Sequence, residues 1–494
     1  MFGWRAKEKP TNSERILGRQ GASHAAHGKP LVTSTHARAL EACAAKLLPP
    51  HMLMQQAGLA VAQLAMAIAP HAKVIWIACG PGNNGGDGYE AATYLKSWGK
   101  SPIVTALDTA GQAPMDAMAA RLKAKNAGVV FAEAVPQEYQ LCIDALFGIG
   151  RIRPWNHQCA TWIQHMNAGR APVLAVDLPS GLDADTGAAP ALRVQANYTL
   201  SLLALKPGLF TADGREASGE IWHNNLGVDP QDHACARLTN LRPTTTRAHN
   251  THKGSYGDVC VVGGASGMTG AAMLAARAAL RGGAGRVYVS MLDRACGQLD
   301  TLQPELMFRE LSGLDLAAMT VVAGCGGGEP IRALMPQLLA QSVRLVLDAD
   351  ALNAIAKDSG LQHALQARRD HTTVITPHPL EAARLMEITT AEVQADRIGI
   401  AQALADRFAC VVVLKGSGTV IAAPGVLPNI NPTGNARLAT AGTGDVLAGL
   451  VGARLTASAD AFMSACDSVF QHGQVADNWG SSATLTAQGL VQAL

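Results

Sequence analysis

Residues 73–98 read KVIWIACGPGNNGGDGYEAATYLKSW. The run VIWIAC is apolar without alternation, which is typical of a strand buried on both faces of a parallel sheet. The glycines after it predict a turn, and the spacing of the apolar residues that follow predicts a helix beginning near Tyr89. A strand, a glycine-rich turn and a helix in this order form the repeating unit of an α/β fold.

The same alternation of apolar runs and Ala-rich helical stretches extends over both halves of the 494-residue chain. A polar stretch rich in Pro, Thr and Asn separates the halves and predicts a linker. Two domains of this size agree with the usual length of a single hydrophobic core. We therefore expect a loose N-terminal extension at 1–30, an α/β domain at 31–235, a linker at 236–250 and a second α/β domain at 251–494.

The composition excludes several classes of protein. Hydrophobic residues make up 48% and charged residues 16%, and the formal net charge is +2, so neither wholesale disorder nor a basic surface for nucleic acid is expected. No apolar run reaches the roughly 18 residues that predict a membrane span. The ten cysteines contain no C-x-x-C pair, which favours reduced thiols in a cytoplasmic protein over a zinc site.

In the first half, acidic residues stand where predicted strands end. Asp144 ends LCID, Asp177 ends PVLAVD, and Asn84 and Asp87 lie in the turn after the first strand. Ligands of doubly wound sheets bind at the carboxyl ends of strands, so we expect these four side chains near one crevice. Their oxygens could hold a hard cation, or one carboxylate could act as a general acid or base. Singly, each Asp is as readily explained as a loop cap.

The glycines of this turn have a predicted role of their own. We expect Gly82, Gly85, Gly86 and Gly88 to supply a permissive backbone, so that peptide N–H groups approach an anion at the helix N-terminus.

In the second half, the segment NPTGNARLATAGTGDVLAGL (431–450) carries the clearest motif. Gly442, Thr443 and Gly444 predict an anion-binding turn before a helix that begins near Asp445. Asp445 would then be placed to take a proton from a hydroxyl that attacks a phosphoryl group. The alternative is an ordinary first-turn helix residue.

Three further segments end predicted strands in this half. The KGSG turn presents Lys415, which could reach a phosphate, and TPHP presents His378, which as a single histidine is more often a capping residue. DADALN places Asp348 and Asp350 at a strand end, where a magnesium ligand and a helix cap are equally good interpretations.

The segments LMQQAG (53–58), GPGNNGGDG (80–88), DALFGIG (144–150) and DLPSGLDADTG (177–187) follow one another in a recognisable order. Together they resemble the N-terminal epimerase domain of the bifunctional NAD(P)H-hydrate repair family, over roughly residues 31–235. The resemblance implies a Rossmann-like three-layer domain in which Asp177 is the catalytic acid or base. It implies a potassium ion at Asn84, Asp144 and Ser180. It also implies a hydrated-nucleotide site formed by Asn83, Asn84, Gly85, Gly86, Asp87, Gly148, Ile149, Gly150, Arg151, Ile152, Arg153, Pro154 and Asp177.

The segments HKGSYGDVCVVGGASGMTGAA (252–272), DADALN (348–353), TPHPLEAARL (376–385) and ATAGTGDVLAG (439–449) resemble the dehydratase half of the same family. This half is similar to ribokinase-like α/β domains. Cys325 stands where the family usually has proline, and Gly327 where it often has leucine. The resemblance implies dinucleotide contacts from Ala272, Gly326, His378 and Asp445, with Asp445 catalytic. It implies adenine-nucleotide contacts from Lys415, Gly416, Ser417, Gly418, Thr419 and Gly444.

The resemblance implies a function in metabolite repair. The first domain would interconvert the R and S hydrates of NADH and NADPH, known as NADHX and NADPHX. The second would dehydrate the S form at the expense of ADP, with magnesium, giving AMP, phosphate and NAD(P)H. From composition, hydropathy and cysteine usage we expect a cytoplasmic protein without nucleic-acid or membrane partners, and we also expect a homo-oligomer.

Two alternatives stay open at this point. The second half could be a ribokinase-like kinase of a small molecule, which would share the GTGD motif. The first half could be a non-catalytic domain that binds only a nucleotide or a protein partner. Asp144, Asp177 and the NNGGD motif argue against the second alternative.

Overall fold

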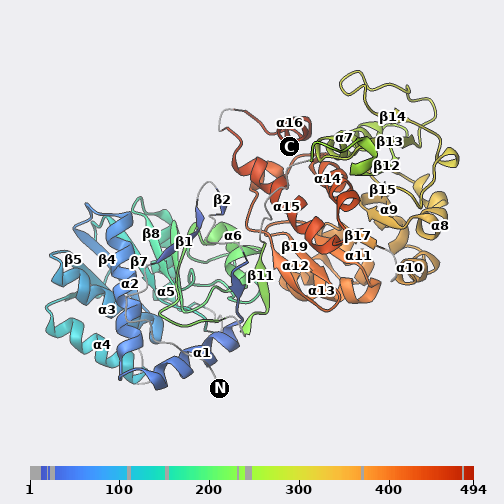
Figure 1. Cartoon of the computed structure of the whole chain (residues 1–494). Helices are drawn as coiled ribbons and strands as arrows, with labels where there is room; N and C mark the ends of the chain where they lie inside the picture. Colours follow the sequence, from blue (N-terminus) through green and yellow to red (C-terminus); the bar gives the residue numbers. More distant parts are fainter. Residues whose placement is uncertain are drawn as a thin grey trace. The chain divides into compact units, whose positions relative to one another are not determined.

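The computed structural model describes residues 13–18, 21–22, 28–107, 113–150, 155–230, 233–239, 248–368, 372–480 and 483–494. The chain divides into two compact units, Met1–Arg237 and Leu238–Leu494. Each unit consists of helices around a sheet, coloured blue to green for the first unit and green to red for the second in Figure 1. The α/β class predicted for both halves is confirmed. Of the predicted linker, residues 240–247 lie outside the described part.

The first unit is built on a largely parallel sheet. Its strands are β1 (Glu14–Gly18), β2 (Gly21–Ala22), β4 (Val74–Cys79), β5 (Ser101–Ala106), β6 (Val130–Phe131), β7 (Leu141–Ala145), β8 (Val173–Val176), β9 (Tyr198–Leu202) and β10 (Glu220–Asn224). The order is β2-β1-β10-β9-β8-β7-β4-β5-β6, and all neighbours from β10 to β6 run parallel. The strand order reverses beside β4, since β5 lies on one side of it and β7 on the other. Such a reversal opens a ligand crevice at the carboxyl ends of the strands.

Helices cover both faces of this sheet. They are α1 (Ser34–Leu47), α2 (Met52–Ile68), α3 (Asn83–Ser97), α4 (Met115–Asn126), α5 (His157–Ala168) and α6 (Gly214–Ala217). Alternate residues of a strand point to opposite faces. On β4, Ile75 and Ile77 therefore pack into a core with α2, α3 and α4, whereas Trp76 and Ala78 pack into another with α5. The predicted three-layer arrangement follows from this continuous apolar strand.

The second unit has a larger run of parallel strands with an antiparallel end. Its strands are β12 (Asp258–Gly263), β13 (Arg286–Met291), β14 (Met307–Phe308), β15 (Thr320–Ala323), β16 (Arg344–Leu347), β17 (Thr372–Ile375), β18 (Val411–Leu414), β19 (Val420–Ala423) and β20 (Val426–Ile430). They are ordered β14-β13-β12-β15-β16-β17-β18-β19-β20, and the order reverses between β12 and β15. The pairs from β14 to β18 are parallel, whereas β18, β19 and β20 form antiparallel hairpins.

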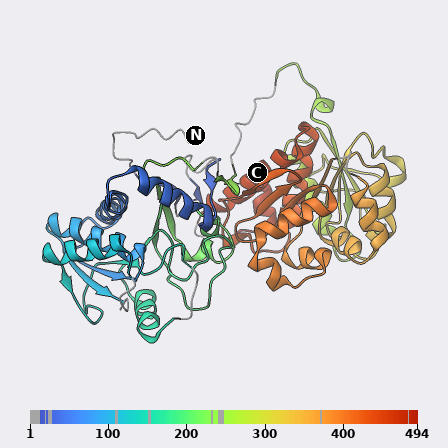
Figure 2. The ribbon, with the colours of Figure 1, turned by 90° about the horizontal axis from the view of Figure 1, so that it is seen from below.

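Helices also lie on both sides of this second sheet (Figure 2). They are α7 (Thr269–Arg281), α8 (Ile331–Gln341), α9 (Ala349–Ala356), α10 (Ser359–Gln366), α11 (Pro379–Met386), α12 (Thr390–Ala395), α13 (Arg397–Phe408), α14 (Thr443–Ala457), α15 (Ala461–Asp477) and α16 (Ala487–Ala493). Side chains of α7, α14 and α15 share one core with Val259, Val322 and Val346 of the sheet.

Helix α3 begins at Asn83, so the predicted start near Tyr89 is wrong. The glycines of the NNGGDG segment were interpreted as a flexible turn, but they belong to the helix. Gly85 and Gly88 have ordinary helical backbone, and glycine is required at these positions because neighbouring atoms leave no room for a side chain. A Cβ at Gly85 would lie 2.0 Å from the Gly80 carbonyl oxygen, and one at Gly88 would lie 2.6 Å from Ala145 Cβ. The NNGGD motif is therefore the first turn of the helix, which brings its polar groups next to β4 and β7.

Helix α14 likewise begins at Thr443, two residues before the predicted start near Asp445. Gly442 is its N-cap and has a φ of 89°, a left-handed value that favours glycine. Gly444 and Asp445 thus lie within the first helical turn.

The N-terminal extension expected at residues 1–30 is partly ordered into the fold, which corrects that prediction. Residues Glu14–Gly18 form β1, which pairs antiparallel with β10 at the edge of the first sheet. Ile16 and Leu17 of this strand are buried. Strand β3 (Pro30–Leu31) pairs antiparallel with β11 (Ala236–Leu238). Apolar burial at the sheet edge explains why this charged segment is ordered.

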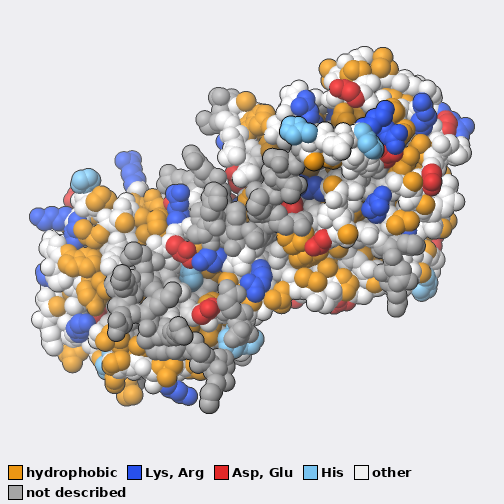
Figure 3. Space-filling view, in the orientation of Figure 1, with side chains coloured by type: hydrophobic (Ala, Val, Ile, Leu, Met, Phe, Trp, Pro, Cys, Tyr) orange, Lys and Arg blue, Asp and Glu red, His pale blue; other side chains and the backbone are white. Residues whose placement is uncertain are grey.

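On the face of the molecule seen in Figure 3, Lys and Arg side chains are interspersed with acidic, apolar and neutral ones. In the part of the chain that the structure describes, every helix falls short of the length and apolar character needed to cross a membrane.

The contact between α14 and α7 yields a test of the packing. A Cβ at Gly449 would lie 2.0 Å from the Ala275 carbonyl oxygen, so Gly449→Ala must push two buried helices apart. We expect a loss of about 1–3 kcal/mol in the free energy of unfolding, measured by chemical denaturation.

Gly270→Ala is the matched control, because Gly270 is an exposed residue of α7 with open space around its Cα. This change should be neutral or stabilise by up to about 1 kcal/mol through helix propensity. Equal effects of the two substitutions would contradict the packing described here.

Candidate active sites

The first candidate site lies where β4, β7 and β8 end. The N-terminal turn of α3, the segment after β7 and the segment after β8 meet there, as the sequence predicts. A methyl group at Gly148 would lie 3.2 Å from Asn84 Oδ1 and 3.3 Å from Asp177 Oδ2. Asn84, Gly148 and Asp177 therefore converge on one point although 93 residues separate the outer two. Only glycine at position 148 leaves this point open.

Asp177 is held in an unusual backbone conformation beside a buried lysine. Its φ is 67°, which is rare for a residue other than glycine, Asn or Asp and is typical of functional sites when the surroundings enforce it. Lys206 Nζ forms an ion pair with Asp177 Oδ1 and donates a hydrogen bond to the Leu202 carbonyl at 2.8 Å. The Leu202 amide also donates to Asp177 Oδ1, at 3.1 Å. These contacts fix the carboxylate with its other oxygen toward Gly148.

More carboxyl groups surround this pair. Glu41 of α1 accepts a hydrogen bond from Asn83 Nδ2 at 3.0 Å. Burial raises the pKa of Glu41, and the nearby Asp177 charge raises it further. Burial, together with the negative charges of Glu41 and Asp177, also raises the pKa of Asp87 well above its usual value. Both shifts favour the neutral form of these carboxyl groups, and carboxyl groups with raised pKa values beside an ionised one are typical of acid–base sites.

Asp144 and Ser180 form a second cluster at the same edge of the sheet. The Ser180 hydroxyl donates to Asp144 Oδ1 at 2.7 Å, and the Ser180 amide donates to Oδ2 at 2.8 Å. Burial raises the pKa of Asp144 to about 6, although the hydrogen bonds from Ser180 oppose the shift. The donors that reach this buried carboxylate are neutral, and the Nδ2 atom of Asn84 is buried without a partner among the described residues.

The oxygen atoms of this cluster fit a monovalent cation. A carboxylate, a hydroxyl and an amide oxygen are hard ligands, and a cation would balance the buried charge of Asp144. These are the residue types of the potassium ligands Asn84, Asp144 and Ser180 that the resemblance implies. Of the three, Asp144 and Ser180 are hydrogen-bonded to each other in the structure.

The remaining predicted residues of the first site fall into two groups. Gly85 and Gly86 are buried in α3, and Ile149 accepts a hydrogen bond from Arg38 through its carbonyl oxygen. Four further predicted residues lie outside the described part of the chain: Arg151, Ile152, Arg153 and Pro154.

Sequence reasoning missed two residues of the first site, Glu41 and Lys206. The charge of Lys206 within the apolar run SLLALKPG is a signal that could have identified it.

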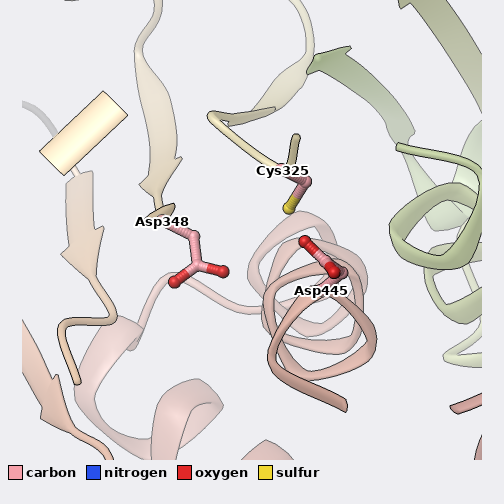
Figure 4. Close-up of side chains that lie close together, drawn as sticks. All are labelled: Cys325, Asp348 and Asp445. Carbon is pink, nitrogen blue, oxygen red and sulfur yellow. The ribbon is translucent and has the colours of Figure 1, made fainter. Parts of the chain in front are cut away.

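The second candidate site lies at the carboxyl ends of β15 and β16, against the N-terminus of α14. Cys325 follows β15, Asp348 follows β16 and Asp445 lies in the first turn of α14. Figure 4 shows the three side chains pointing toward one another. One ligand atom from each lies within 4.8 Å of the other two. The structure therefore brings together Asp348 and Asp445, which were predicted from separate motifs. It adds Cys325, which the sequence analysis noted only as a departure from the family pattern.

Lys415 completes this cluster. Its Nζ lies 2.6 Å from Asp348 Oδ1, and the Thr376 hydroxyl donates to the same oxygen at 2.8 Å. Burial lowers the pKa of Lys415, but the negative charges of Asp348 and Glu381 outweigh it, so the net shift is upward. A methyl group at Gly444 would lie 3.5 Å from Lys415 Nζ. A phosphate at the α14 N-terminus would thus meet both backbone N–H groups and this ammonium.

The electrostatics of Asp445 suit a base. Burial raises its pKa to about 6, and the charge of Asp348 adds to the shift. The carboxyl group is therefore ionised near neutral pH but is more basic than an exposed aspartate, which favours proton transfer from a hydroxyl.

The turn predicted to bind the adenine nucleotide is shaped by two glycines and one buried arginine. Gly416 and Gly418 have φ values of 131° and 64°, which favour glycine. Arg397, only 1% exposed, donates from Nη2 to the carbonyls of Leu414 at 3.2 Å and Lys415 at 3.1 Å. Gly416 and Ser417 are exposed, and the Thr419 hydroxyl donates to the Gly416 carbonyl. Sequence reasoning missed Arg397, which fixes the backbone of this turn.

Other predicted residues have mainly structural contacts. His378 caps α11: its Nδ1 accepts hydrogen bonds from the amides of Leu380 and Glu381. Burial lowers the pKa of His378 and raises that of Glu381 to about 7. Ala272 is fully buried in the core, and Gly326 is buried with a φ of 58°. His378 still lies close enough to the site to feel the charge of Lys415.

Asp348 and Asp350 prove to have different contacts. The Asp348 side chain makes no capping hydrogen bond to α9 and pairs with Lys415 instead. Asp350 accepts a hydrogen bond from the Gly328 amide at 2.9 Å and so holds the glycine-rich loop after β15. The free carboxylate oxygen of Asp348 is a hard ligand of the kind that magnesium prefers, whereas the Cys325 thiol is not.

Two α/β units with acid–base groups beside helix N-termini define an enzyme with two small-molecule sites, the second next to a phosphate-binding turn. Comparison with known proteins agrees with this class. A family model described as NAD(P)H-hydrate dehydratase matches residues 259–494, and one described as YjeF-related protein N-terminus matches residues 50–208. The chain belongs to the family of bifunctional NAD(P)H-hydrate repair enzymes.

The similarity to named relatives extends over most of the chain. The bifunctional NAD(P)H-hydrate repair enzyme of Escherichia coli (strain K12) is 37% identical over 445 residues, which cover 86% of this chain and 84% of the relative. That of Coxiella burnetii is 34% identical, covering 86% of this chain and 89% of the relative. Among solved structures, the ADP/ATP-dependent NAD(P)H-hydrate dehydratase of Bacillus subtilis, co-crystallised with ATP and Mg²⁺, is 29% identical with a TM-score of 0.43. The match covers 50% of this chain and 91% of the Bacillus subtilis chain.

These findings confirm the resemblance, the metabolite-repair function and the assignment as an isomerase joined to a lyase. The kinase with a non-catalytic N-terminal half is not favoured. The individual site residues stay predictions.

The buried Arg397 yields a test of the second site. Arg397→Met removes the guanidinium that pairs with the carbonyls of the 415–418 turn, leaving buried acceptors without donors. We expect a loss of about 2–4 kcal/mol in the free energy of unfolding of the second unit, measured by chemical denaturation.

Arg407→Met is the control on the same helix, because Arg407 is partly exposed and lies 3.9 Å from Glu387. Its effect should stay below about 1 kcal/mol. If Arg397→Met costs no more than Arg407→Met, the turn does not depend on the buried guanidinium.

Proposed function

We propose that the first unit interconverts the R and S hydrates of NADH and NADPH through acid–base chemistry at Asp177. The Asp177 carboxylate exchanges a proton with the ring hydroxyl as the hydrated ring opens and recloses. Lys206 holds the carboxylate in place and offsets its charge. NNGGD (83–87) and the loop 148–154 surround the nucleotide. A potassium ion at Asn84, Asp144 and Ser180 would supply fixed positive charge beside it.

The second unit dehydrates the S hydrate with ADP as phosphoryl donor. Asp445 takes the proton of the ring hydroxyl, whose oxygen attacks the β-phosphoryl group, and AMP leaves. Phosphate then leaves the ring carbon as a proton leaves its neighbour, which restores the double bond. Lys415 and the backbone N–H groups at Gly444 stabilise the charge on the transferred group. Magnesium bound with ADP would offset the phosphate charge.

The observation that best supports this proposal is that Asp445, Lys415 and Asp348 lie close together at the N-terminus of α14. This arrangement combines a base with a pKa of about 6, an ammonium group and a helix N-terminus within one cluster. Those are the three elements that phosphoryl transfer to a hydroxyl needs. Ala272, Gly326 and His378 line the dinucleotide end of the site in this proposal, and residues 415–419 the adenosine end.

Location and assembly are further parts of the proposal. The ten cysteines are free thiols and most are buried, which supports a reducing compartment such as the cytoplasm. A second copy of the chain would cover exposed apolar side chains such as Met115 and Leu122 of α4, which supports a homo-oligomer.

The direct test of the second activity is a product balance. The protein is incubated with the S hydrate of NADH, ADP and magnesium, and the products are separated by chromatography. We expect one AMP and one phosphate for each NADH recovered. A stable phosphorylated product without recovery of NADH would instead support a ribokinase-like kinase.

Lys206 provides a test of the first activity. Lys206→Met leaves the Asp177 carboxylate buried without its cation, so we expect epimerisation to slow by roughly 10²–10⁴-fold. The rate is measured as the return of a purified epimer to the R/S equilibrium. Dehydration of the S hydrate by the same variant should be unchanged, since Lys206 belongs to the other unit.

Lys100→Met is the control, because Lys100 is a partly exposed residue of the first unit whose ammonium group donates a hydrogen bond to the Pro70 carbonyl. Epimerisation at the wild-type rate by Lys206→Met would remove this lysine from the mechanism.

The pKa of Asp445 predicts the pH dependence of dehydration. The base acts in its ionised form, and burial raises its pKa to about 6. As the pH falls below about 6, protonation should therefore lower kcat/KM for the S hydrate by about tenfold per pH unit. Asp445→Asn should be nearly inactive at every pH. A rate that stays level from pH 7 to well below 6 would contradict the assignment of Asp445 as the base.

A further inference from the structure

Cys325 introduces a sulfur ligand into a cluster that otherwise contains only oxygen and nitrogen. Its side chain is fully buried, and Figure 4 shows its Sγ facing the carboxyl groups of Asp348 and Asp445. The three residues come from three segments of the chain, and the sulfur and one oxygen of each carboxyl group lie within 4.8 Å of one another. The three side chains could therefore coordinate a single metal ion between them.

The spacing requires only small movements to bind such an ion. A tetrahedral Zn²⁺ has sulfur at about 2.3 Å and carboxylate oxygens at about 2.0–2.2 Å, so its ligand atoms lie about 3.5 Å apart. Side-chain rotations that bring the three atoms together by about 1 Å would reach this geometry. Asp445 is only partly buried, which leaves the cluster open to an entering ion and a water ligand on that side.

The charges of the cluster also match a divalent cation. With the thiol deprotonated, Cys325, Asp348 and Asp445 carry three negative charges, and Lys415 supplies one positive charge. The remaining two negative charges equal the charge of one divalent ion. Asp348 Oδ1 is occupied by Lys415 and Thr376, which leaves Oδ2 as its ligand atom. A methyl group at Gly444 would lie 4.0 Å from this oxygen.

Sulfur decides which ion the cluster prefers. Magnesium and calcium are hard ions that bind oxygen, whereas thiolate ligands select zinc, cadmium and similar thiophilic ions. A residue without a thiol at position 325 would leave two carboxylates without this preference. The selectivity therefore depends on Cys325.

We propose that Cys325, Asp348 and Asp445 form a binding site for a thiophilic divalent cation of the Zn²⁺ type, and that an ion bound there blocks the second active site. As the metal–sulfur bond forms, the thiol proton is displaced and released to solvent. The ion also occupies Asp445, so this carboxylate cannot act as the base while the ion is present. The blocking effect rests on the proposed dehydratase function, but the binding of the ion does not.

The binding is measured with Cd²⁺, because a cadmium–thiolate bond gives an ultraviolet charge-transfer band. The full chain carries Cys43→Ser and Cys296→Ser, which removes one exposed and one partly exposed thiol that would bind cadmium elsewhere. We expect a band that saturates at one Cd²⁺ per chain and that excess Zn²⁺ abolishes. Excess Mg²⁺ should leave the band in place.

Three variants in this background locate the site. Cys325→Ser and Cys325→Pro should lose the band, and Asp445→Asn, which keeps the thiol, should bind Cd²⁺ at least tenfold more weakly. Cys260→Ser is the control, since Cys260 is buried in β12 away from the cluster and its removal should change nothing. A band that persists in both Cys325 variants, or its absence from the parent protein, would overturn the proposal.

Inhibition is tested separately. Zn²⁺ should stop NADH recovery from the S hydrate at fixed ADP and Mg²⁺, and a chelator should restore it. Cys325→Pro should need at least tenfold more Zn²⁺ for the same inhibition. Equal sensitivity of the two proteins would overturn the blocking role. A parent protein that shows the cadmium band but no dehydration without zinc would leave the ion site standing and contradict the proposed function.

Discussion

In each unit a lysine ammonium is held against an aspartate carboxylate at the carboxyl edge of the sheet: Lys206 with Asp177 and Lys415 with Asp348. Removing one partner of such a pair leaves a buried charge that costs several kcal/mol. The two pairs therefore constrain the loops that carry them, and other site groups are arranged around them. Gly148 opens toward Asp177, and Gly444 lies beside Lys415.

The sheets determine where these pairs stand. In both units the strand order reverses near the site, beside β4 in the first and between β12 and β15 in the second. Parallel strands end on one edge, so residues far apart in sequence meet there. Close-packed glycines such as Gly85 and Gly449 bring α3 and α14 against neighbouring backbone. Their N-termini consequently face the same edge as the carboxylates, which places helix N–H groups and acid–base groups together.

Much of this arrangement could be predicted from the sequence, because apolar runs identify buried strands and acidic residues directly after them identify the edge. Asp144, Asp177 and Asp348 were found in that way, whereas Asp445 was found from the glycine-rich turn that precedes its helix. The start of α3 was predicted six residues too late, since glycines that serve close packing resemble glycines that serve a turn.

Glu41, Lys206 and Arg397 could not be recognised by spacing. Glu41 reaches its site from a helix far away in sequence, and Arg397 acts on backbone carbonyls of a hairpin that only the folded chain places beside α13. The pairing of Cys325 with the two aspartates depends on the same tertiary contacts. Local pattern predicts where strands end, but it does not predict which charged side chains fold back toward those ends.

The most direct test of the account is the recovery of reduced-nicotinamide absorbance from a mixture of R and S hydrates of NADH, with ADP and magnesium. The account predicts complete recovery by the parent protein, recovery of little beyond the S fraction by Asp177→Asn, and none by Asp445→Asn. Complete recovery by Asp177→Asn at the parental rate, or no recovery by the parent protein, would contradict the claim that two separate acid–base sites act in sequence.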